Sequence, residues 1–209
     1  MTRKLIIVIV SVALVFSLGV AGTAQAREWG LSFPSMRRAL ATQRSDVTQY
    51  VRVVNDAGVP AATLDVTLAA ITQQANSQLR PAWGTPRISF IFRAKEGAYR
   101  LYLEPEADAL GDYHSQDWDM TPAATVTVDG APADWQVAVS HEILEMLVDP
   151  SGKGDEICDP VAYDPYEFDG ATVSDFALPA WFRAGSSGPW DYLHATGAAK
   201  QDVNGGYES

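Results

Sequence analysis

The sequence predicts an α+β fold: a mixed four-stranded sheet, two main helices on one face of that sheet, and an irregular C-terminal part with a β-hairpin. Three observations support this prediction. Four short apolar or alternating runs are typical of strands, and two longer segments carry apolar residues at helical spacing. The elements follow one another as strand, helix, three strands and helix, so the first helix can make a right-handed crossover on the sheet.

The N-terminal segment is expected to lie outside this fold. Arg3 and Lys4 precede an uncharged apolar run, Leu5 to Val20, and Ala24-Gln25-Ala26 resembles the cleavage site of an export signal. The expected location is therefore secreted or extracytoplasmic, with an uncleaved membrane anchor as the alternative. The predicted division of the chain is a signal peptide at 1–26, a loosely ordered segment at 27–46 and a single domain at 47–209.

The charge of the chain excludes some classes of partner. It has 15 basic and 26 acidic residues, a formal net charge of −11, and loss of 1–26 removes two basic and no acidic residues, which gives −13. Nucleic acid and an acidic membrane surface are unfavourable partners, because phosphate binding needs clustered Lys and Arg. Clustered carboxylates favour cations instead. The single cysteine, Cys158, excludes an internal disulfide, and we expect its thiol to be buried and inert.

The first helix is predicted from Pro60 to about Leu79, because proline suits a first helical turn and apolar residues then recur every three or four positions. Pro81 and Gly84 are expected to end it. The polar segment 105–122 is expected to be a long functional or mobile loop. The four predicted strands are 48–54, 87–93, 99–104 and 124–129.

The chain after Pro150 is expected to be irregular except for one hairpin. Its strands are predicted at 166–168 and 172–176, and Asp169-Gly170 between them favours a tight hairpin turn. The hairpin and tail, 156–209, complete the predicted domain, with the tail on the surface.

The second helix, 133–149, is expected to carry a metal site on its polar face. His141 and Glu145 are four residues apart, so their side chains stand one above the other on one face. A His and a Glu at this spacing can bind one metal ion from the same side, and Glu142 stands beside them where a general base acts. The competing interpretation is an ordinary surface helix whose polar face is solvated.

The pattern is HExxE, with Glu145 where zinc peptidases of the HExxH type carry a second histidine. Carboxylate oxygen is a legitimate zinc ligand, but oxygen-rich ligation also suits harder ions. We expect a divalent cation, Zn²⁺ first, with Ca²⁺ or Mn²⁺ as alternatives. A third ligand is expected from Glu156 or Asp159, which follow a flexible turn, and the sequence leaves that choice open; Asp175 is a more distant candidate.

Two further side chains have expected roles near this site. Asp149 lies about 12 Å along the helix axis from His141, too far to share a metal ion, and is expected to organise the turn that follows. His114 lies in the predicted long loop, and we expect it either to be an ordinary surface or packing histidine or to reach over the cleft and stabilise an oxyanion.

Several blocks of sequence resemble a family of bacterial and phage proteins of uncharacterised activity. They extend from about Val47 to the C-terminus, so this resemblance implies kinship over nearly the whole predicted domain but no chemistry. The blocks are Gln74-Ala75-Asn76, Leu79-Arg80-Pro81-Ala82-Trp83-Gly84, Gly111-x-Tyr113-His114, the segment Ser140-His141-Glu142-Ile143-Leu144-Glu145-Met146-Leu147-Val148-Asp149-Pro150, Glu156-Ile157-Cys158-Asp159-Pro160, Val173-Ser174-Asp175-Phe176 and Pro179-Ala180-Trp181-Phe182.

The order of elements is also similar to that of zincin metallopeptidases, in which a sheet with a helical crossover precedes the metal-binding helix. An edge strand, here expected at 124–129, borders the substrate cleft in those enzymes. This resemblance implies ligand roles for His141 and Glu145 and a general-base role for Glu142.

The expected function is that of an exported metal-dependent hydrolase, a peptidase acting on peptides or proteins. The alternative is a non-catalytic cation-binding or interaction module on a degenerate zincin-like frame. A third hypothesis is a cell-surface or virion-associated interaction domain whose contact surface includes Trp83, Trp118, Trp135, Trp181 and Trp190.

Overall fold

The computed structural model describes residues 47–106, 111–162 and 164–193. The predicted signal peptide at 1–26, the segment 27–46 and the tail from 194 lie outside the described residues. No helix of the described ranges is long and apolar enough to span a membrane.

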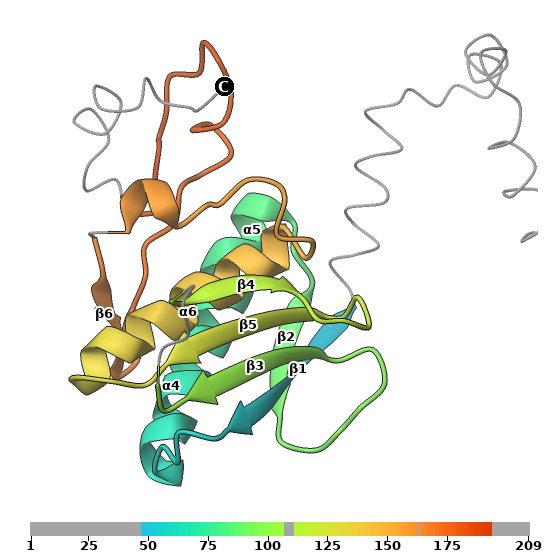
Figure 1. The fold of residues 1–209 in the computed structure, drawn as a ribbon. Coiled ribbons are helices and arrows are strands. Elements are labelled where there is room, and N and C mark those ends of the chain that lie inside the picture. Colours follow the sequence, from blue (N-terminus) through green and yellow to red (C-terminus); the bar gives the residue numbers. More distant parts are fainter. Residues whose placement is uncertain (1–46, 107–110, 163, 194–209) are drawn as a thin grey trace, which may run out of the picture. The chain divides into compact units, whose positions relative to one another are not determined.

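A mixed five-stranded sheet forms the centre of the described fold, one strand more than predicted (Figure 1). The strands lie in the order β2-β1-β3-β5-β4, with the first four parallel and β4 antiparallel to β5. Buried Val51, Val53, Leu101 and Leu103 alternate with more exposed neighbours, so one face of the sheet is apolar. The strands are β1 Thr48–Asn55, β2 Arg87–Ile91, β3 Tyr99–Glu104, β4 Tyr113–Gln116 and β5 Pro122–Thr127.

Strand β4 corrects two predictions. It lies inside the segment 105–122, which was expected to be one long loop, and it takes the antiparallel edge of the sheet. The strand expected at that edge, 124–129, is β5 and lies between β3 and β4. The backbone N–H of Thr127 donates a hydrogen bond of 2.7 Å to the Asp112 carboxylate, which fixes the entry to β4 against β5.

The crossover helix is longer and less regular than predicted. It consists of α4 (Ala61–Gln74), a π-helical turn η1 (Ala75–Leu79) and α5 (Arg80–Trp83). Pro81 does not end it, because the wide turn starts a new hydrogen-bond pattern and places Pro81 in a first turn, where its missing N–H leaves no bond unmade. Gly84, with φ of +71°, ends the helix as expected.

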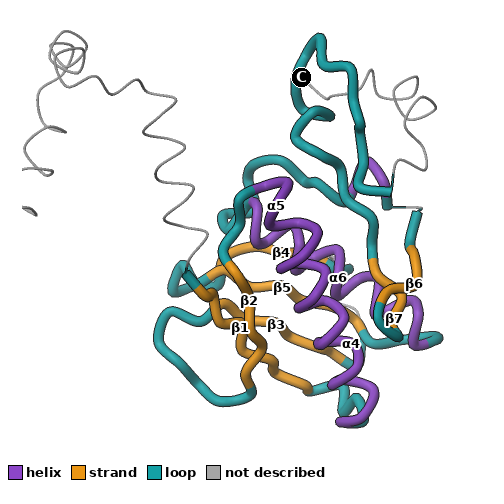
Figure 2. Tube along the Cα trace, turned by 180° about the vertical axis from the view of Figure 1, so that it is seen from behind, coloured by secondary structure: helices purple, strands orange, loops and turns teal. Residues whose placement is uncertain are grey.

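Helix α6 (Pro132–Val148) has nearly the predicted bounds. Together with α4 it covers one face of the sheet, which Figure 2 shows with the helices in front of the strands. Val139, Ile143 and Leu147 are buried on this helix, but so are Glu142 and Glu145, because the C-terminal part covers its polar side. The competing interpretation of a solvated polar face is therefore wrong for the two glutamates.

The C-terminal part contains a short 3-10 helix, η2 (Asp159–Val161), and the hairpin of β6 (Tyr166–Phe168) and β7 (Ala171–Val173). Asp169 and Gly170 at its turn have φ of +50° and +87°, as tight hairpin turns require. The predicted second strand reached 176, but Ser174 leaves the ladder because its N–H donates to the Ser140 hydroxyl of α6, at 3.1 Å.

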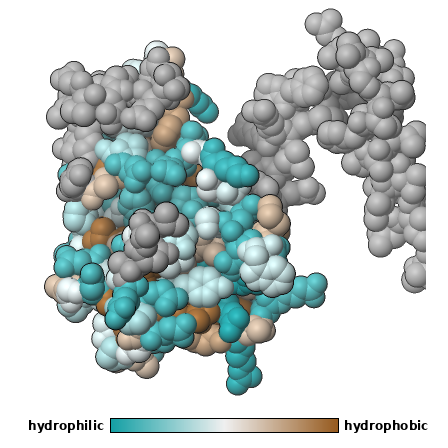
Figure 3. Space-filling view, in the orientation of Figure 1, coloured by the Kyte–Doolittle hydropathy of each residue, from teal (hydrophilic) through white to brown (hydrophobic). Residues whose placement is uncertain are grey.

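The opposite face of the sheet carries no helix of the described chain and is largely hydrophilic (Figure 3). Arg100 of β3 pairs there with Asp117 and, at 2.6 Å, with Asp119. These two ion pairs attach the turn between β4 and β5 to the sheet. Trp118 at that turn is 94% exposed.

Candidate metal centre

Three separate parts of the chain meet at the polar side of α6. The helix itself presents His141, Glu142 and Glu145, since Glu145 lies four and three positions after the other two, and such positions are neighbours on a helix surface. Strand β4 brings in His114, and the start of η2 brings in Asp159. Five of the six side chains expected at the site are therefore brought together.

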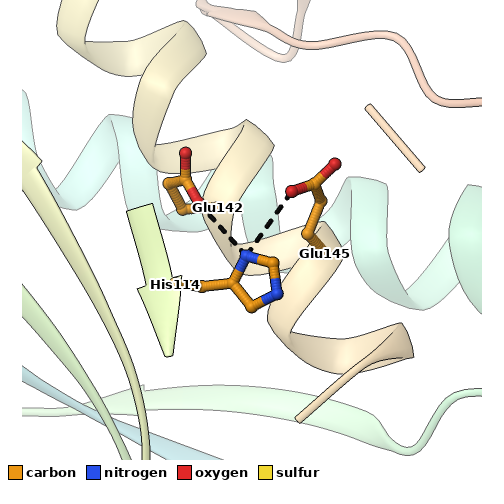
Figure 4. Close-up of side chains that lie close together, drawn as sticks. All are labelled: His114, Glu142 and Glu145. Carbon is orange, nitrogen blue, oxygen red and sulfur yellow. Dashed lines mark hydrogen bonds and ion pairs between the residues drawn. The ribbon is translucent and has the colours of Figure 1, made fainter. Parts of the chain in front are cut away.

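The first group consists of His114, Glu142 and Glu145 (Figure 4). Nδ1 of His114 lies 3.4 Å from Oε2 of Glu142 and 3.4 Å from Oε2 of Glu145. These side chains are 3%, 8% and 3% exposed, so the group is closed to solvent. Neither contact is as short as a normal N–H···O hydrogen bond, about 2.9 Å.

The second group consists of His141, Glu145 and Asp159. Nε2 of His141 lies 3.6 Å from Oε1 of Glu145 and 3.2 Å from Oδ1 of Asp159. The Asp159 side chain is 59% exposed and His141 is 15% exposed, so this group opens to solvent. In each group the three ligand atoms lie within 4.8 Å of one another.

Glu145 belongs to both groups, and its hydrogen bonds also hold Asp159 at the site. Its Oε1 accepts hydrogen bonds from the backbone N–H of Cys158, at 2.8 Å, and of Asp159, at 3.3 Å. The segment that returns after Pro150 is thereby attached to α6 one turn beyond His141. Its other oxygen, Oε2, faces His114, so the two carboxylate oxygens point to different imidazoles.

Burial and neighbouring charges act in opposite directions on the two imidazoles. Burial alone would lower the pKa of His141, but the hydrogen bond to Asp159 and the charge of Glu145 raise it to about 9. Burial also opposes protonation of His114, whose pKa is nevertheless above its ordinary value because of Glu142 and Glu145. Without a metal, a protonated His141 would balance part of the charge of the carboxylates around it.

The carboxyls of the second group are affected unequally. Burial raises the pKa of Glu145 to about 7, against the charge of His141 and the Cys158 N–H, which lower it. The hydrogen bond with His141 keeps the pKa of Asp159 below its usual value. Glu156, the sixth expected side chain, shares a hydrogen bond with Asp159 that raises its own pKa, but it is not a member of either three-residue group.

Three other side chains considered from the sequence belong to neither group. Asp149 organises the turn after α6, as expected, by accepting hydrogen bonds from Ser151 and from the N–H groups of Lys153 and Gly154. Asp175 is fully buried near Asp191 and joins neither group. Cys158 is buried, and burial raises its thiol pKa well above the ordinary value, so it has no nucleophilic character.

The tryptophans do not form one contact surface. Trp135, Trp181 and Trp190 are buried, and only Trp118 of the five is strongly exposed. This removes the structural basis of an interaction surface made of all five.

A cavity of about 390 Å³ adjoins the second group. Asp159 of the second group lines it, together with Glu156 and the aromatic residues Trp181 and Phe182. The cavity extends the open side of the second group by enough volume for a side chain of a peptide substrate.

Comparison with protein-family models, with curated proteins and with solved structures gives no match to this chain. The similarity to zincin metallopeptidases therefore stays a prediction, and the function has to be argued from the geometry of the site.

Proposed function

We propose that this protein is an exported metal-dependent hydrolase with a zincin-like arrangement that cleaves peptide bonds. The observation that carries the proposal is the convergence of His141 Nε2, Glu145 Oε1 and Asp159 Oδ1 beside the buried carboxylate of Glu142. A bound divalent cation would supply Lewis acidity toward the substrate carbonyl and would lower the pKa of water.

The distances in the second group suit a cation. Tetrahedral ligands about 2.1 Å from Zn²⁺ are about 3.4 Å from one another. The two distances from His141 Nε2, 3.6 Å and 3.2 Å, bracket that value. A catalytic metal also needs a coordination position that no protein ligand occupies, and the exposed side of the group at Asp159 leaves room for one. One nitrogen and two oxygen donors favour Zn²⁺, with Mn²⁺ or Ca²⁺ as alternatives, and Glu156 is near enough to Asp159 to add a ligand.

Glu142 is the proposed general base. It lies three residues before Glu145 on α6, and both carboxylates contact Nδ1 of His114 at 3.4 Å. Its carboxylate would therefore stand beside a cation of the second group, where it can accept a proton from the attacking water. His114 contacts that carboxylate, and its Nε2 has no hydrogen-bond partner among the described residues. These contacts favour a role for His114 in positioning Glu142. The oxyanion role expected from the sequence is less favoured.

The surroundings of the site favour an extended peptide as the substrate. Strand β4 is the antiparallel edge strand of the sheet and carries His114, so it adjoins the site as the edge strand of a zincin-like cleft would. The cavity beside Asp159 can accept one substrate side chain. The net charge of −11 makes nucleic acid an unfavourable substrate.

One observation favours a second candidate, a cation-binding module without catalysis. The hydrogen bonds from Cys158 and Asp159 to Glu145 attach the return segment to α6, so a cation at His141 and Asp159 would also stabilise the fold. This candidate predicts a higher melting temperature with metal and no cleavage of any peptide.

The test compares wild-type protein with Glu142→Gln and His141→Ala, using metal content and cleavage of a mixed peptide pool. We expect Glu142→Gln to keep the tightly bound metal and to lose at least about 100-fold in kcat/KM, because only the proton acceptor is removed. His141→Ala should lose both the tightly bound metal and hydrolysis.

The exposed Asp129, just before α6, provides the control, because Asp129→Asn removes a carboxylate that lies in neither group. It should behave as wild type. Wild-type cleavage rates in Glu142→Gln would contradict the assignment of the base, and unchanged metal content in His141→Ala would contradict the assignment of the site.

A further inference from the structure

We propose that the site binds two divalent cations bridged by Glu145, the second of them held by His114, Glu142 and the Glu145 oxygen that faces them. The inference rests on the proposed function for the first cation, at His141, Glu145 and Asp159. It adds a second, weaker site that regulates the first.

The spacing of the first group is that of metal ligands. Nδ1 of His114 lies 3.4 Å from one oxygen of Glu142 and 3.4 Å from one oxygen of Glu145. Ligands on a common Zn²⁺ ion are about 3.4 Å apart, whereas N–H···O hydrogen bonds are about 2.9 Å. A single proton on Nδ1 of His114 cannot be donated fully to two carboxylates at once. With only that proton, one of the two carboxylate oxygens lacks a good hydrogen bond from His114.

The carboxylate of Glu145 has the orientation of a bridge. Oε1 lies 3.6 Å from the imidazole of His141, and Oε2 lies 3.4 Å from the imidazole of His114. A carboxylate that gives one oxygen to each of two cations holds them about 4 Å apart, the separation found in two-metal hydrolytic sites. Both groups therefore share one ligand without sharing a ligand atom.

The charge at the site favours a second cation. Glu142 and Glu145 are both buried, and buried carboxylates need positive partners. Asp159 is 59% exposed and Glu156 is exposed, so water compensates much of their charge, and the second cation would neutralise the buried charges of Glu142 and Glu145.

The second cation has to bind more weakly and to restrain hydrolysis. It would enter about 4 Å from a cation of equal charge, so repulsion lowers its affinity. It would also occupy the carboxylate of Glu142, which then cannot accept a proton from water. Activity should therefore rise as the first equivalent binds and fall at least tenfold as the second binds.

Titration of the metal-free full chain with Zn²⁺, followed by calorimetry and elemental analysis, tests the stoichiometry. We expect two equivalents in the wild type, one tight and one weaker. His114→Ala and the isosteric Glu142→Gln should keep the tight equivalent and lose the weaker one. Asp129→Asn, which removes an exposed carboxylate outside both groups, should keep both.

Mn²⁺ tests the bridge itself. The first equivalent should give the paramagnetic resonance spectrum of an isolated ion, and the second should attenuate it through coupling across Glu145. The proposal is overturned if the wild type saturates at one equivalent, or if Glu142→Gln still binds two equivalents. If His114→Ala does not fold, the stoichiometry of Glu142→Gln alone decides between the outcomes. Binding of two equivalents without peptide cleavage would overturn the proposed hydrolase but support the bridged pair of cations. Peptide cleavage with only one bound equivalent would support the hydrolase and overturn the bridged pair.

Discussion

Glu145 occupies the position that carries histidine in the HExxH pattern, and its contacts explain what a carboxylate contributes there. One oxygen accepts two backbone N–H groups, from Cys158 and Asp159, while it also faces His141. The other faces His114. A neutral imidazole offers a single acceptor nitrogen, so it could not bind a metal and also attach the return segment. The glutamate and the folding back of 156–159 therefore depend on each other.

Asp175 is a second buried carboxyl group, outside the candidate metal centre. It is 0% exposed, and its Oδ1 accepts N–H groups of Phe176, at 2.8 Å, and Leu193, at 3.3 Å. Burial is the largest of the effects that raise its pKa from 3.8 to about 7; the nearby carboxyl of Asp191 also raises it, and the backbone donors lower it. Tyr166 and Cys158 also interact electrostatically with it.

Asp175→Asn should change how stability depends on pH. The folded chain holds the Asp175 proton more tightly than the unfolded chain, so this stabilising contribution is complete below about pH 4 and is lost as pH rises through about 7. The amide reproduces the protonated carboxyl and keeps the acceptor for Phe176. Between pH 5 and pH 8 the wild type should lose on the order of 2 kcal/mol of unfolding free energy more than the variant.

Urea unfolding of both proteins at pH 5 and pH 8 measures this difference. Asp129→Asn is the control, because that exposed carboxyl should leave the pH dependence unchanged. Parallel pH profiles for wild type and Asp175→Asn would contradict the assignment of a buried proton to Asp175.

Among the elements, β4 shows where sequence patterns stop being informative. The segments β1, β3 and α6 were predicted almost to the residue, because their apolar periodicity reflects burial along their whole length. Strand β4 has four residues and only His114 is buried, so its sequence has no apolar alternation. Its conformation depends on pairing with β5, and a pattern within four residues does not encode such a contact with another segment.

The turn that follows α6 comes close to β4 at Gly152. This glycine has φ of +62°, and a Cβ atom there would lie 3.1 Å from the carbonyl oxygen of His114 and 3.3 Å from Cα of Ser115. Gly97 has a similar φ, +72°, with no atom within 4 Å of its Cβ position. The two glycines therefore separate backbone strain from contact with β4.

Gly152→Ala should destabilise the fold more than Gly97→Ala does. Both variants place a Cβ atom in the left-handed region, which costs about 1–2 kcal/mol. Gly152→Ala also pushes against the backbone of β4, which should add about 1 kcal/mol or more. Thermal unfolding of both variants measures the difference. Equal losses would show that β4 gives way freely and that the turn does not fix the position of His114.

At the scale of the whole molecule, the sequence predicted the α+β class, the crossover and the convergence of His141 with Glu145. It did not predict that Asp159 rather than Glu156 contacts His141, because that choice depends on backbone hydrogen bonds to Glu145. It also missed the pairing of His114 with both glutamates. Each omission concerns a contact between elements far apart in the chain, which a periodic pattern does not encode.

One buried polar network joins the three main parts of the described fold. The Ser140 hydroxyl on α6 donates to Oε1 of Gln74 on α4, at 2.8 Å, and accepts the N–H of Ser174, at 3.1 Å. The Gln74 amide in turn donates to the carbonyl of Ser174, at 2.7 Å. The crossover helix, the metal-site helix and the C-terminal part thus share one closed set of hydrogen bonds.

Ser140→Ala should therefore cost about 2 kcal/mol of unfolding free energy, because it leaves two buried polar groups without partners. Ser77→Ala is the matched control: its hydroxyl bonds the carbonyl of Gln73 on an exposed surface, and its loss should change stability by less than about 0.5 kcal/mol. Denaturant unfolding measures both values. A loss below 1 kcal/mol in Ser140→Ala would indicate that water replaces the hydroxyl.

The π-helical turn at Ala75–Leu79 has a consequence for chain length. Removing one residue from it would restore a regular helix and rotate everything beyond by about 100°. The amide group of Asn76 accepts a hydrogen bond from the N–H of Ile88 and donates one to its carbonyl. Both hydrogen bonds to β2 would then be lost. Natural variants of this chain should accordingly tolerate insertions and deletions in the exposed turn at 92–97, while the spacing between residues 74 and 80 stays invariant.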